Sequence, residues 1–450
     1  MNSATLPRKL EFSDALAIVV GVMIGSGIFL VPSSIAQTLP SPAAIVAVWV
    51  FGGIISLFGA FAFAELCAMM PDTGGQYTHL REAYGSLCAF LFGWALFTVI
   101  RAGGTATLAV GFTIYLGQFV PLSPLLSKAA AVAIVLTFTL VNYRGVRLGA
   151  GVQRLLTVLK VLGILVVIAS AFMSSQSSGT NWTLSGDGLS LSSFGVAMIA
   201  CLWGYQGWFA VCWVAGEIKQ PGRNLPLSLG LGVGATIALY VSANLAYMKI
   251  LTVTEIANAD RVAATVTERV LGPAGAMLVS LTILISIAGA INGGLLAAPR
   301  VYFAQARDGL FFRRFGTVHP RFETPAFSIL ATGVWASILA VSGSYQKLFS
   351  YVIFTSWIFY GLTVGAVFIL RRKYPDLPRP YKTWGYPVTP LIFVIVTVAF
   401  VGNSIITTPG PSLIGLGIVA SGIPIYLYWR RQQSPAVPSE PAISAARNAR

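Results

Sequence analysis

"VVGVMIGSGIFLVPSSIA", residues 19–36, is the stretch that decides the fold. It is apolar enough to form a membrane helix, yet Gly25, Ser26 and Gly27 lie at its centre and Pro32 follows. Glycine inside a helix costs about 1 kcal/mol relative to alanine, and proline removes a backbone hydrogen bond. A spanning helix weakened at its centre needs a reason, and we predict that this one is unwound there.

The composition of the whole chain is that of a helical membrane protein. Of 450 residues, 56% are hydrophobic and only 10% are charged, and the mean hydropathy is +0.78. So few charges could not cover the surface of a soluble protein of this size. The apolar runs are long, whereas a membrane β-barrel has short alternating segments. The first run is long enough to span, so we expect no cleaved signal peptide.

Twelve runs have the length of about 20 residues that a transmembrane helix needs. We therefore predict an all-α polytopic membrane protein with twelve transmembrane helices. The expected spans are 13–36, 43–70, 85–117, 125–143, 150–174, 192–216, 227–250, 272–299, 326–343, 348–371, 386–407 and 411–429.

Basic residues set the expected orientation. Of the 29 Lys and Arg residues, 22 fall on the side of the amino terminus and five on the other, while Arg101 and Lys160 lie inside predicted spans. The side with more basic residues is normally cytoplasmic, so we expect both termini in the cytoplasm. The net charge of +15 thus indicates orientation rather than nucleic-acid binding. Residues 1–12 form the expected cytoplasmic amino terminus, and residues 430–450 a disordered cytoplasmic tail.

A second span is weakened in the same way. "LWGYQGWF", residues 202–209, carries Gly204, which lies 179 residues after Gly25. The two weakened helices each begin a set of five, and because five is odd the second set is inverted. Broken helices at matching positions of inverted halves point to the binding site of a transporter. The predicted parts are a first repeat 13–174, a second repeat 192–371 and two further helices in 386–429.

A broken helix exposes backbone groups that can bind a ligand. Unsatisfied backbone groups in lipid cost several kcal/mol each, so an unwound turn persists only around a cavity. The half-helix that begins after the break presents free N–H groups to a carboxylate, and the half that ends before it presents carbonyls to an ammonium group. An α-amino acid carries both groups. The alternative is that the glycines only allow close helix packing.

Several stretches resemble the amino acid–polyamine–organocation superfamily, and more narrowly its L-type amino acid transporter branch. The resemblance runs from about residue 12 to 407 and implies a LeuT-type five-plus-five inverted repeat and amino acid transport. The stretches that carry it are "GVMIGSGIFLVP" (21–32), "AELCAMMPDTGGQYTHLREAYG" (64–85), "VIRAGG" (99–104), "NYRGVRLGAGVQRLLTVLK" (142–160), "ARDGLFFRRFGTVHPRFETP" (306–325) and "LRRKYPDLPRPYK" (370–382).

The resemblance also implies a substrate site at the two breaks. The carboxylate is expected on the N–H groups of Ser26 and Gly27, and the amino group on carbonyls around Met23, Trp203 and Gln206. Trp203 replaces the family's gate phenylalanine and Gln206 replaces a glycine, so both add bulk beside the site. The expected substrate-binding residues are Met23, Ile24, Gly25, Ser26, Gly27, Trp203, Gly204, Tyr205, Gln206 and Gly207.

Lys160 lies near the midplane of predicted helix 5, about 15 Å along the helix axis. By resemblance, family members place a lysine where sodium-coupled relatives hold a cation between helices 1, 5 and 8. We expect a fixed cation there, with the hydroxyl of Ser286 as its partner on helix 8, and transport that does not need sodium. The alternative is a structural lysine bonded to carbonyls at a helix end. Elsewhere, we consider a pair between Arg101 and Glu65, and place Glu217 at the membrane interface.

The sequence favours a carrier of small to medium neutral L-amino acids, by exchange or proton coupling. A polyamine or cationic amino acid carrier needs buried carboxylates, and the spans offer only Glu65. A sensor or channel on the same fold is the other alternative. We find no enzyme signature, P-loop, metal motif or cofactor site. We read the sequon at 181–183 as a chance match outside eukaryotes.

The remaining expectations concern partners and location. We expect the lipid bilayer and an amino acid substrate as partners, and leave a homo-oligomer open. Eukaryotic members of the branch attach a heavy subunit through a cysteine between helices 3 and 4, but residues 116–127 contain none. We therefore expect no disulfide-linked heavy subunit. The four cysteines all fall in predicted helices, so no disulfide framework is expected. A bacterial inner membrane fits best.

Overall fold

The structure is a computed structural model that describes residues 6–179, 190–342 and 345–432. Helices follow one another through these ranges, and no strand forms within them beyond one isolated bridge between Leu10 and Ile218. The sequon and residues 433–450 of the predicted tail lie outside the described residues. The α-helices are α1 (Phe12–Met23), α2 (Gly27–Thr38), α3 (Pro42–Met69), α4 (Gln76–Tyr84), α5 (Ser86–Ala95), α6 (Arg101–Leu116), α7 (Pro124–Tyr143), α8 (Val146–Met173), α9 (Leu191–Gly204), α10 (Ala210–Trp213), α11 (Pro221–Ile250), α12 (Val253–Asn258), α13 (Val262–Leu271), α14 (Pro273–Ala297), α15 (Pro299–Arg307), α16 (Ala326–Ser342), α17 (Tyr345–Lys373), α18 (Val388–Thr407), α19 (Pro409–Ala420) and α20 (Gly422–Gln432).

The predicted all-helical, polytopic fold is confirmed. Within the described ranges, ten helices are long and apolar enough to cross a membrane. The remaining two predicted spans are shorter apolar helices, Ser192–Gly204 and Ala326–Ser342. The first of these is short because the predicted span 192–216 is interrupted, so the count of twelve full-length helices is not reached.

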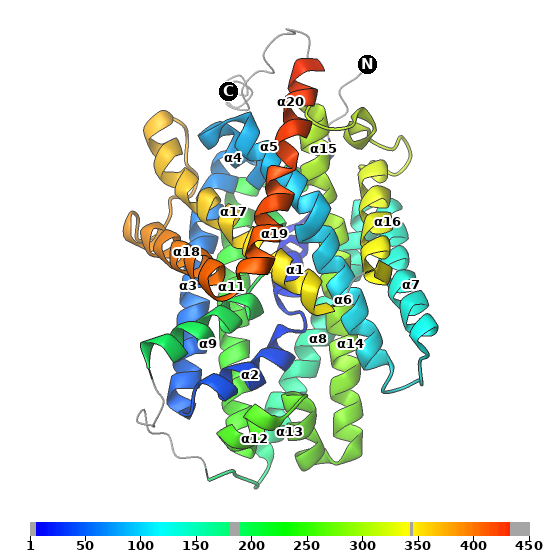
Figure 1. The fold of residues 1–450 in the computed structure, drawn as a ribbon, viewed down its shortest axis with the longest axis vertical. Coiled ribbons are helices and arrows are strands. Elements are labelled where there is room, and N and C mark those ends of the chain that lie inside the picture. The colour runs from blue at the N-terminus through cyan, green and yellow to red at the C-terminus, as the bar shows by residue number, and fades with distance from the viewer. Residues whose placement is uncertain (1–5, 180–189, 343–344, 433–450) are drawn as a thin grey trace.

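Both predicted interruptions are present, near the middle of the molecule. α1 ends at Met23 and α2 begins at Gly27, while α9 ends at Gly204 and α10 begins at Ala210 (Figure 1). α2 packs against α9, and α1 packs against α10. Pro32 lies inside α2 without ending it. The break therefore falls at the glycines and not at the proline.

Helix 3 contains a third irregularity that the sequence did not indicate. A π-helical turn, Leu96–Ile100, separates α5 from α6. Residue 102, directly after Arg101, is alanine, and residues 96–102 contain no proline that could explain the turn. π-turns occur mostly as single turns inside α-helices and often at functional sites. This one ends directly before Arg101.

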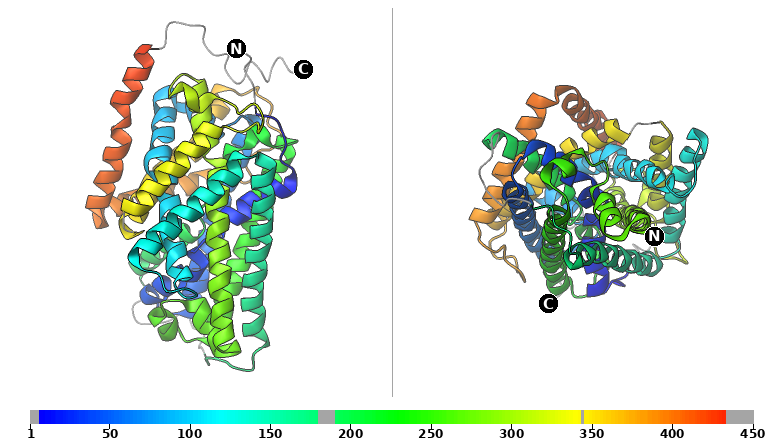
Figure 2. Two further views of the ribbon diagram at one scale, coloured as in Figure 1. Left: turned by 90° about the vertical axis from the view of Figure 1, so that its right-hand side faces the viewer. Right: turned by 90° about the horizontal axis from the view of Figure 1, so that it is seen from below.

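α1 lies at the centre of the bundle, packed against α8, α11 and α14, with α3 against α11 and α8 against α14. α19 and α20 stand at the periphery (Figure 2). α20 ends at the opposite end of the molecule from α12 and α13 (Figure 1). Lys9 pairs with Glu323, just before α16, so both ends of the described chain lie at the α15–α20 end. The four cysteines are all free, and each lies in a described helix.

The buried ion pairs differ from those suggested by the sequence. Glu65 does not pair with Arg101, because its carboxylate accepts hydrogen bonds of 2.8 and 2.7 Å from Arg371. Glu217, which the sequence places at the membrane interface, has a buried partner that the sequence did not indicate. Its side chain is fully buried and accepts a 2.6 Å hydrogen bond from Arg300, which is 1% exposed. A charge buried at this depth needs such a partner, since an unpaired one costs several kcal/mol.

Candidate functional site

The break in helix 1 leaves backbone donors free at the start of α2. No acceptor among the described residues takes the N–H groups of Ser26, Gly27 and Ile28, and no side chain caps this helix. The first N–H groups of a helix have no partner within it, and together with the helix dipole they attract an anion. The amino end of α2 is therefore a ready site for a carboxylate.

The carbonyls before the break are already engaged. The carbonyl of Met23 accepts from the hydroxyl of Tyr240 at 3.0 Å and from the N–H of Gly25 at 2.9 Å. The hydroxyl of Ser286 donates to the carbonyls of Ile24 at 2.8 Å and Gly25 at 3.1 Å. These bonds hold the unwound turn in a fixed shape, because Tyr240 anchors it to α11 and Ser286 anchors it to α14.

Lys160 is fully buried between the three helices that the sequence placed around it. Its ammonium group donates to the carbonyls of Gly21 (2.9 Å), Ile24 (2.8 Å) and Ser286 (2.8 Å). The predicted hydroxyl contact with Ser286 is thus wrong, since the backbone carbonyl of Ser286 is the acceptor. An ammonium group has three donors, and all three are used here. Gly289 makes room, because a Cβ there would lie 2.8 Å from Nζ.

The two breaks meet at glycines. A Cβ on Gly27 would lie only 2.9 Å from the Cα of Gly204, so the start of α2 touches the backbone at the end of α9. Gly207, in the second break, has φ +115°, and a Cβ there would lie 2.8 Å from the carbonyl of Val22. Side chains at these positions would separate the two interrupted helices. Gly25 differs, because a Cβ there would meet nothing closer than 4.0 Å.

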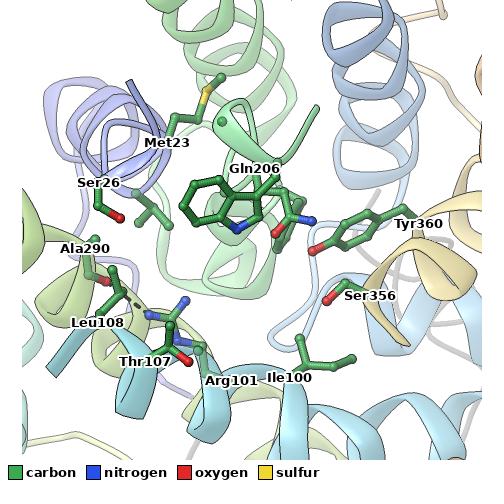
Figure 3. A pocket seen from close by; sticks show the side chains of 18 of the residues that line it. Met23, Ser26, Ile100, Arg101, Thr107, Leu108, Gln206, Ala290, Ser356 and Tyr360 are labelled. Carbon is green, nitrogen blue, oxygen red and sulfur yellow. Dashed lines mark hydrogen bonds between the residues drawn. The ribbon is translucent and has the colours of Figure 1, made fainter. Parts of the chain in front are cut away.

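A cavity of about 130 Å³ lies between the breaks and helices α6, α14 and α17 (Figure 3). One water molecule needs about 10–15 Å³ on this measure, so a small organic molecule fits. Eight of the ten predicted substrate-binding residues line it: Met23, Gly25, Ser26, Gly27, Trp203, Gly204, Gln206 and Gly207.

The other two predicted residues do not line the cavity. Ile24 is fully buried, and its carbonyl serves Lys160 and Ser286. Tyr205 is also fully buried, and its hydroxyl donates to the carbonyl of Trp49 at 3.0 Å. Both residues therefore belong to the support of the site rather than to its wall.

Several wall residues were not predicted as binding residues. They come from the π-turn, α6, α14, α17 and the segment Phe209–Trp213, and include Ile100, Arg101, Gly104, Thr107, Leu108, Phe209, Trp213, Ala290, Ser356 and Tyr360. Figure 3 shows Arg101 and Thr107 on one side of the cavity and Gln206 and Tyr360 on another. The position of Arg101 inside a predicted span was the one signal in the sequence, and it suggested a pair with Glu65 rather than a place in the cavity wall.

Aromatic residues line the cavity near α10, and a buried charged pair lies just after this helix. The rings of Phe209 and Tyr360 are 4.4 Å apart, and both side chains are buried. Beyond them, the pair of Glu217 and Arg300 ties the segment after α10 to α15. His79 in α4 is fully buried, and burial lowers its pKa to about 4, so its imidazole is neutral at pH 7.

The sequence that forms this cavity and these interrupted helices matches known proteins. The model of a family described as amino acid permease matches residues 10–427. The chain belongs to the amino acid permease family. The permease is 32% identical over 416 residues to b(0,+)-type amino acid transporter 1 of Homo sapiens, covering 91% of this chain and 85% of that protein.

Two further relatives cover nearly the whole permease. Serine/threonine exchanger SteT of Bacillus subtilis (strain 168) is 32% identical over 436 residues, which are 95% of this chain and 98% of that one. Large neutral amino acids transporter small subunit 2 of Mus musculus is 30% identical over 447 residues, 96% of this chain and 83% of that one. The predicted superfamily is therefore confirmed, and the permease is an integral membrane transport protein and not an enzyme.

Proposed function

We propose that the permease is a sodium-independent secondary transporter of small to medium neutral L-amino acids that works by alternating access, as an exchanger or with proton coupling. The observation that carries this proposal is the free amino end of α2, with the N–H groups of Ser26 and Gly27 facing the same cavity as the turn after α9. A carboxylate bound there gains charge-assisted hydrogen bonds, which are worth about 1.5–3 kcal/mol each.

The two ends of an α-amino acid suit the two sides of this cavity. With the carboxylate on α2, the ammonium group points to the turn after α9 and reaches the carbonyl of Gln206, because the carbonyls of Met23 and Trp203 already accept hydrogen bonds within the protein. The side chain then extends towards Trp203, whose half-buried indole limits its size. A channel or sensor needs neither free donors at a closed cavity nor a break in two helices.

The proposal of neutral amino acids as substrates rests on the lack of acidic residues around the cavity. No Asp or Glu lines it among the described residues, so the cationic side chain of a polyamine or basic amino acid has no partner. Two of the relatives are named for serine and threonine or for large neutral amino acids, which agrees with this class.

Lys160 supports independence from sodium. Its ammonium group takes the carbonyls of Gly21, Ile24 and Ser286, which together join α1, α8 and α14. A sodium ion at this point would need the same oxygens, so the fixed cation takes its place. These bonds hold the unwound turn of helix 1 in place. If they break and re-form during transport, helix 1 moves together with the change between outward-open and inward-open states.

We further propose that 13–174 and 192–371 are the two inverted repeats, with both termini in the cytoplasm and a bacterial inner membrane as the location. The two breaks at matching positions and the excess of basic residues at the end that holds both termini support this arrangement. The proposed permease works without a disulfide-linked heavy subunit, since residues 116–127 hold no cysteine.

Purified permease in liposomes tests the function. Uptake of radiolabelled serine, threonine, alanine and leucine is measured with choline in place of sodium, into vesicles that are empty or loaded with unlabelled amino acid. Uptake only into loaded vesicles indicates exchange, and uptake into empty vesicles driven by a pH gradient indicates proton coupling. If no amino acid enters under any condition, the carrier proposal fails and the sensor alternative gains support.

A further inference from the structure

Three polar side-chain atoms in the cavity wall have no hydrogen-bond partner among the residues that the structure describes. They are Nε of Arg101, Oγ1 of Thr107 and Nε2 of Gln206, and each is shielded from solvent. Most buried polar groups in proteins are bonded, and each exception needs an explanation. All three atoms can donate a hydrogen bond, so the cavity is short of acceptors.

Arg101 differs from the other buried cations of the described residues. Arg300 pairs with Glu217, and Lys160 is saturated by three carbonyls. The guanidinium of Arg101 donates one hydrogen bond, 3.1 Å long, to the carbonyl of Ala290, and no carboxylate among the described residues pairs with it. A guanidinium stays charged in proteins, so this cation lacks its counter-charge.

The surrounding helices are shaped to hold the guanidinium at the cavity. A Cβ on Gly294 of α14 would lie 1.5 Å from its Nη2, so only glycine leaves room there. The π-turn Leu96–Ile100 directly precedes Arg101. Figure 3 shows Arg101 beside Thr107, with the amide of Gln206 across the cavity. The fold thus places a cation and two neutral side chains with unused donors in the wall of one small cavity.

We propose that the cavity also accepts dicarboxylic amino acids, with the side-chain carboxylate paired to Arg101. The α-carboxylate takes the N–H groups of Ser26 and Gly27, which leaves Arg101 for a second carboxylate. The hydroxyl of Thr107 and the amide of Gln206 provide its further donors. This widens the substrate range beyond neutral amino acids, and it rests on the proposed function that the cavity is the transport site.

The acid–amide pairs of amino acids provide a matched test. Aspartate and asparagine have nearly the same shape, as do glutamate and glutamine, and within each pair only the acid brings a negative charge. Competition against a radiolabelled neutral substrate is measured for all four in proteoliposomes of the wild type. We expect at least one acid to compete about tenfold better than its amide, as a charge-assisted bond to Arg101 requires.

Variants test whether Arg101 causes the preference for the acid over its amide. Arg101→Gln should remove most of the acid preference while neutral amino acids still compete, and Thr107→Val should reduce it less. Arg223→Gln removes an exposed arginine far from the cavity and should leave the preference unchanged. Should Arg101→Gln fail to fold, the wild-type acid–amide ratio and Thr107→Val decide the question.

Two results would overturn the inference while leaving the carrier intact. One is a wild type in which each amide competes as well as its acid or better. The other is a folded Arg101→Gln variant that keeps the acid preference. By contrast, a wild type that takes up no amino acid at all would remove the proposed function itself, so the two failures are distinguishable.

Discussion

Replacing Gly27 by alanine probes the contact between the two breaks. The new Cβ would lie 2.9 Å from the Cα of Gly204 and 3.4 Å from its carbonyl oxygen. Both are backbone atoms, so no side chain can rotate away, and α2 and α9 must separate by about 0.5 Å to reach ordinary contact. Overpacking of this kind costs about 1–3 kcal/mol.

The cost falls on the state in which α2 and α9 are in contact. A penalty of about 1–3 kcal/mol on this state shifts a two-state equilibrium by about 5- to 150-fold. The variant therefore stays folded but should lose affinity and turnover by a factor in this range. Affinity is measured by binding of a radiolabelled amino acid to purified permease, turnover by uptake into loaded liposomes, and folding by thermal unfolding.

Gly234→Ala, in α11 and away from the cavity lining, is the control. A Cβ there would meet nothing within 4 Å, so binding and turnover should stay within about twofold of the wild type. The reasoning is refuted if Gly27→Ala behaves like the wild type, or if both variants lose function equally.

Three other predictions concern the wall, the fixed cation and the end of the molecule at α12 and α13. Trp203→Ala should impair uptake, whereas Trp203→Phe should retain most of it and admit larger substrates, as a size series of amino acids would show; unchanged selectivity in both removes Trp203 from the site. Lys160→Ala removes three hydrogen bonds that join α1, α8 and α14 and should lower turnover more than thermal stability, and a strict sodium requirement of the wild type would contradict the fixed-cation role. The hydrogen bond from Arg269 holds the pKa of Glu255 at about 2, below its ordinary 4.5, so the stability from this pair is complete above about pH 4.5 and is lost as the pH falls through about 2. Hydrogen exchange of α12 and α13, corrected for intrinsic rates, should show this loss in the wild type and no such pH dependence in Glu255→Gln.

The sequence could predict the breaks because their cause is local. Gly25 and Gly27 weaken a helix wherever they stand, and a weakened span in lipid implies a cavity. The cation between three helices was also accessible, since Lys160 is too deep to reach water. The ends of the helices were harder to predict. α11 begins at Pro221, ahead of the predicted 227, because its first turns carry polar residues that a hydropathy pattern excludes.

The rest depends on contacts between distant parts of the chain. Glu217 and Arg300 are 83 positions apart, and nothing in either neighbourhood indicates the pair. Tyr360 and Phe209 lie side by side in the cavity wall although they are far apart in the sequence. Whether Arg101 has a counter-charge depends on which side chains the fold brings next to it in the cavity wall. Sequence reasoning placed Arg101 at the right depth but could not show which side of α6 faces the cavity.

A structure of the permease with a transported amino acid bound tests the central claim most directly. The account predicts density between the two breaks, with a carboxylate oxygen within hydrogen-bond distance of the N–H groups of Ser26 or Gly27 and the side chain directed towards Trp203. An amino acid bound away from both breaks, or one whose carboxylate lies far from the start of α2, would contradict it.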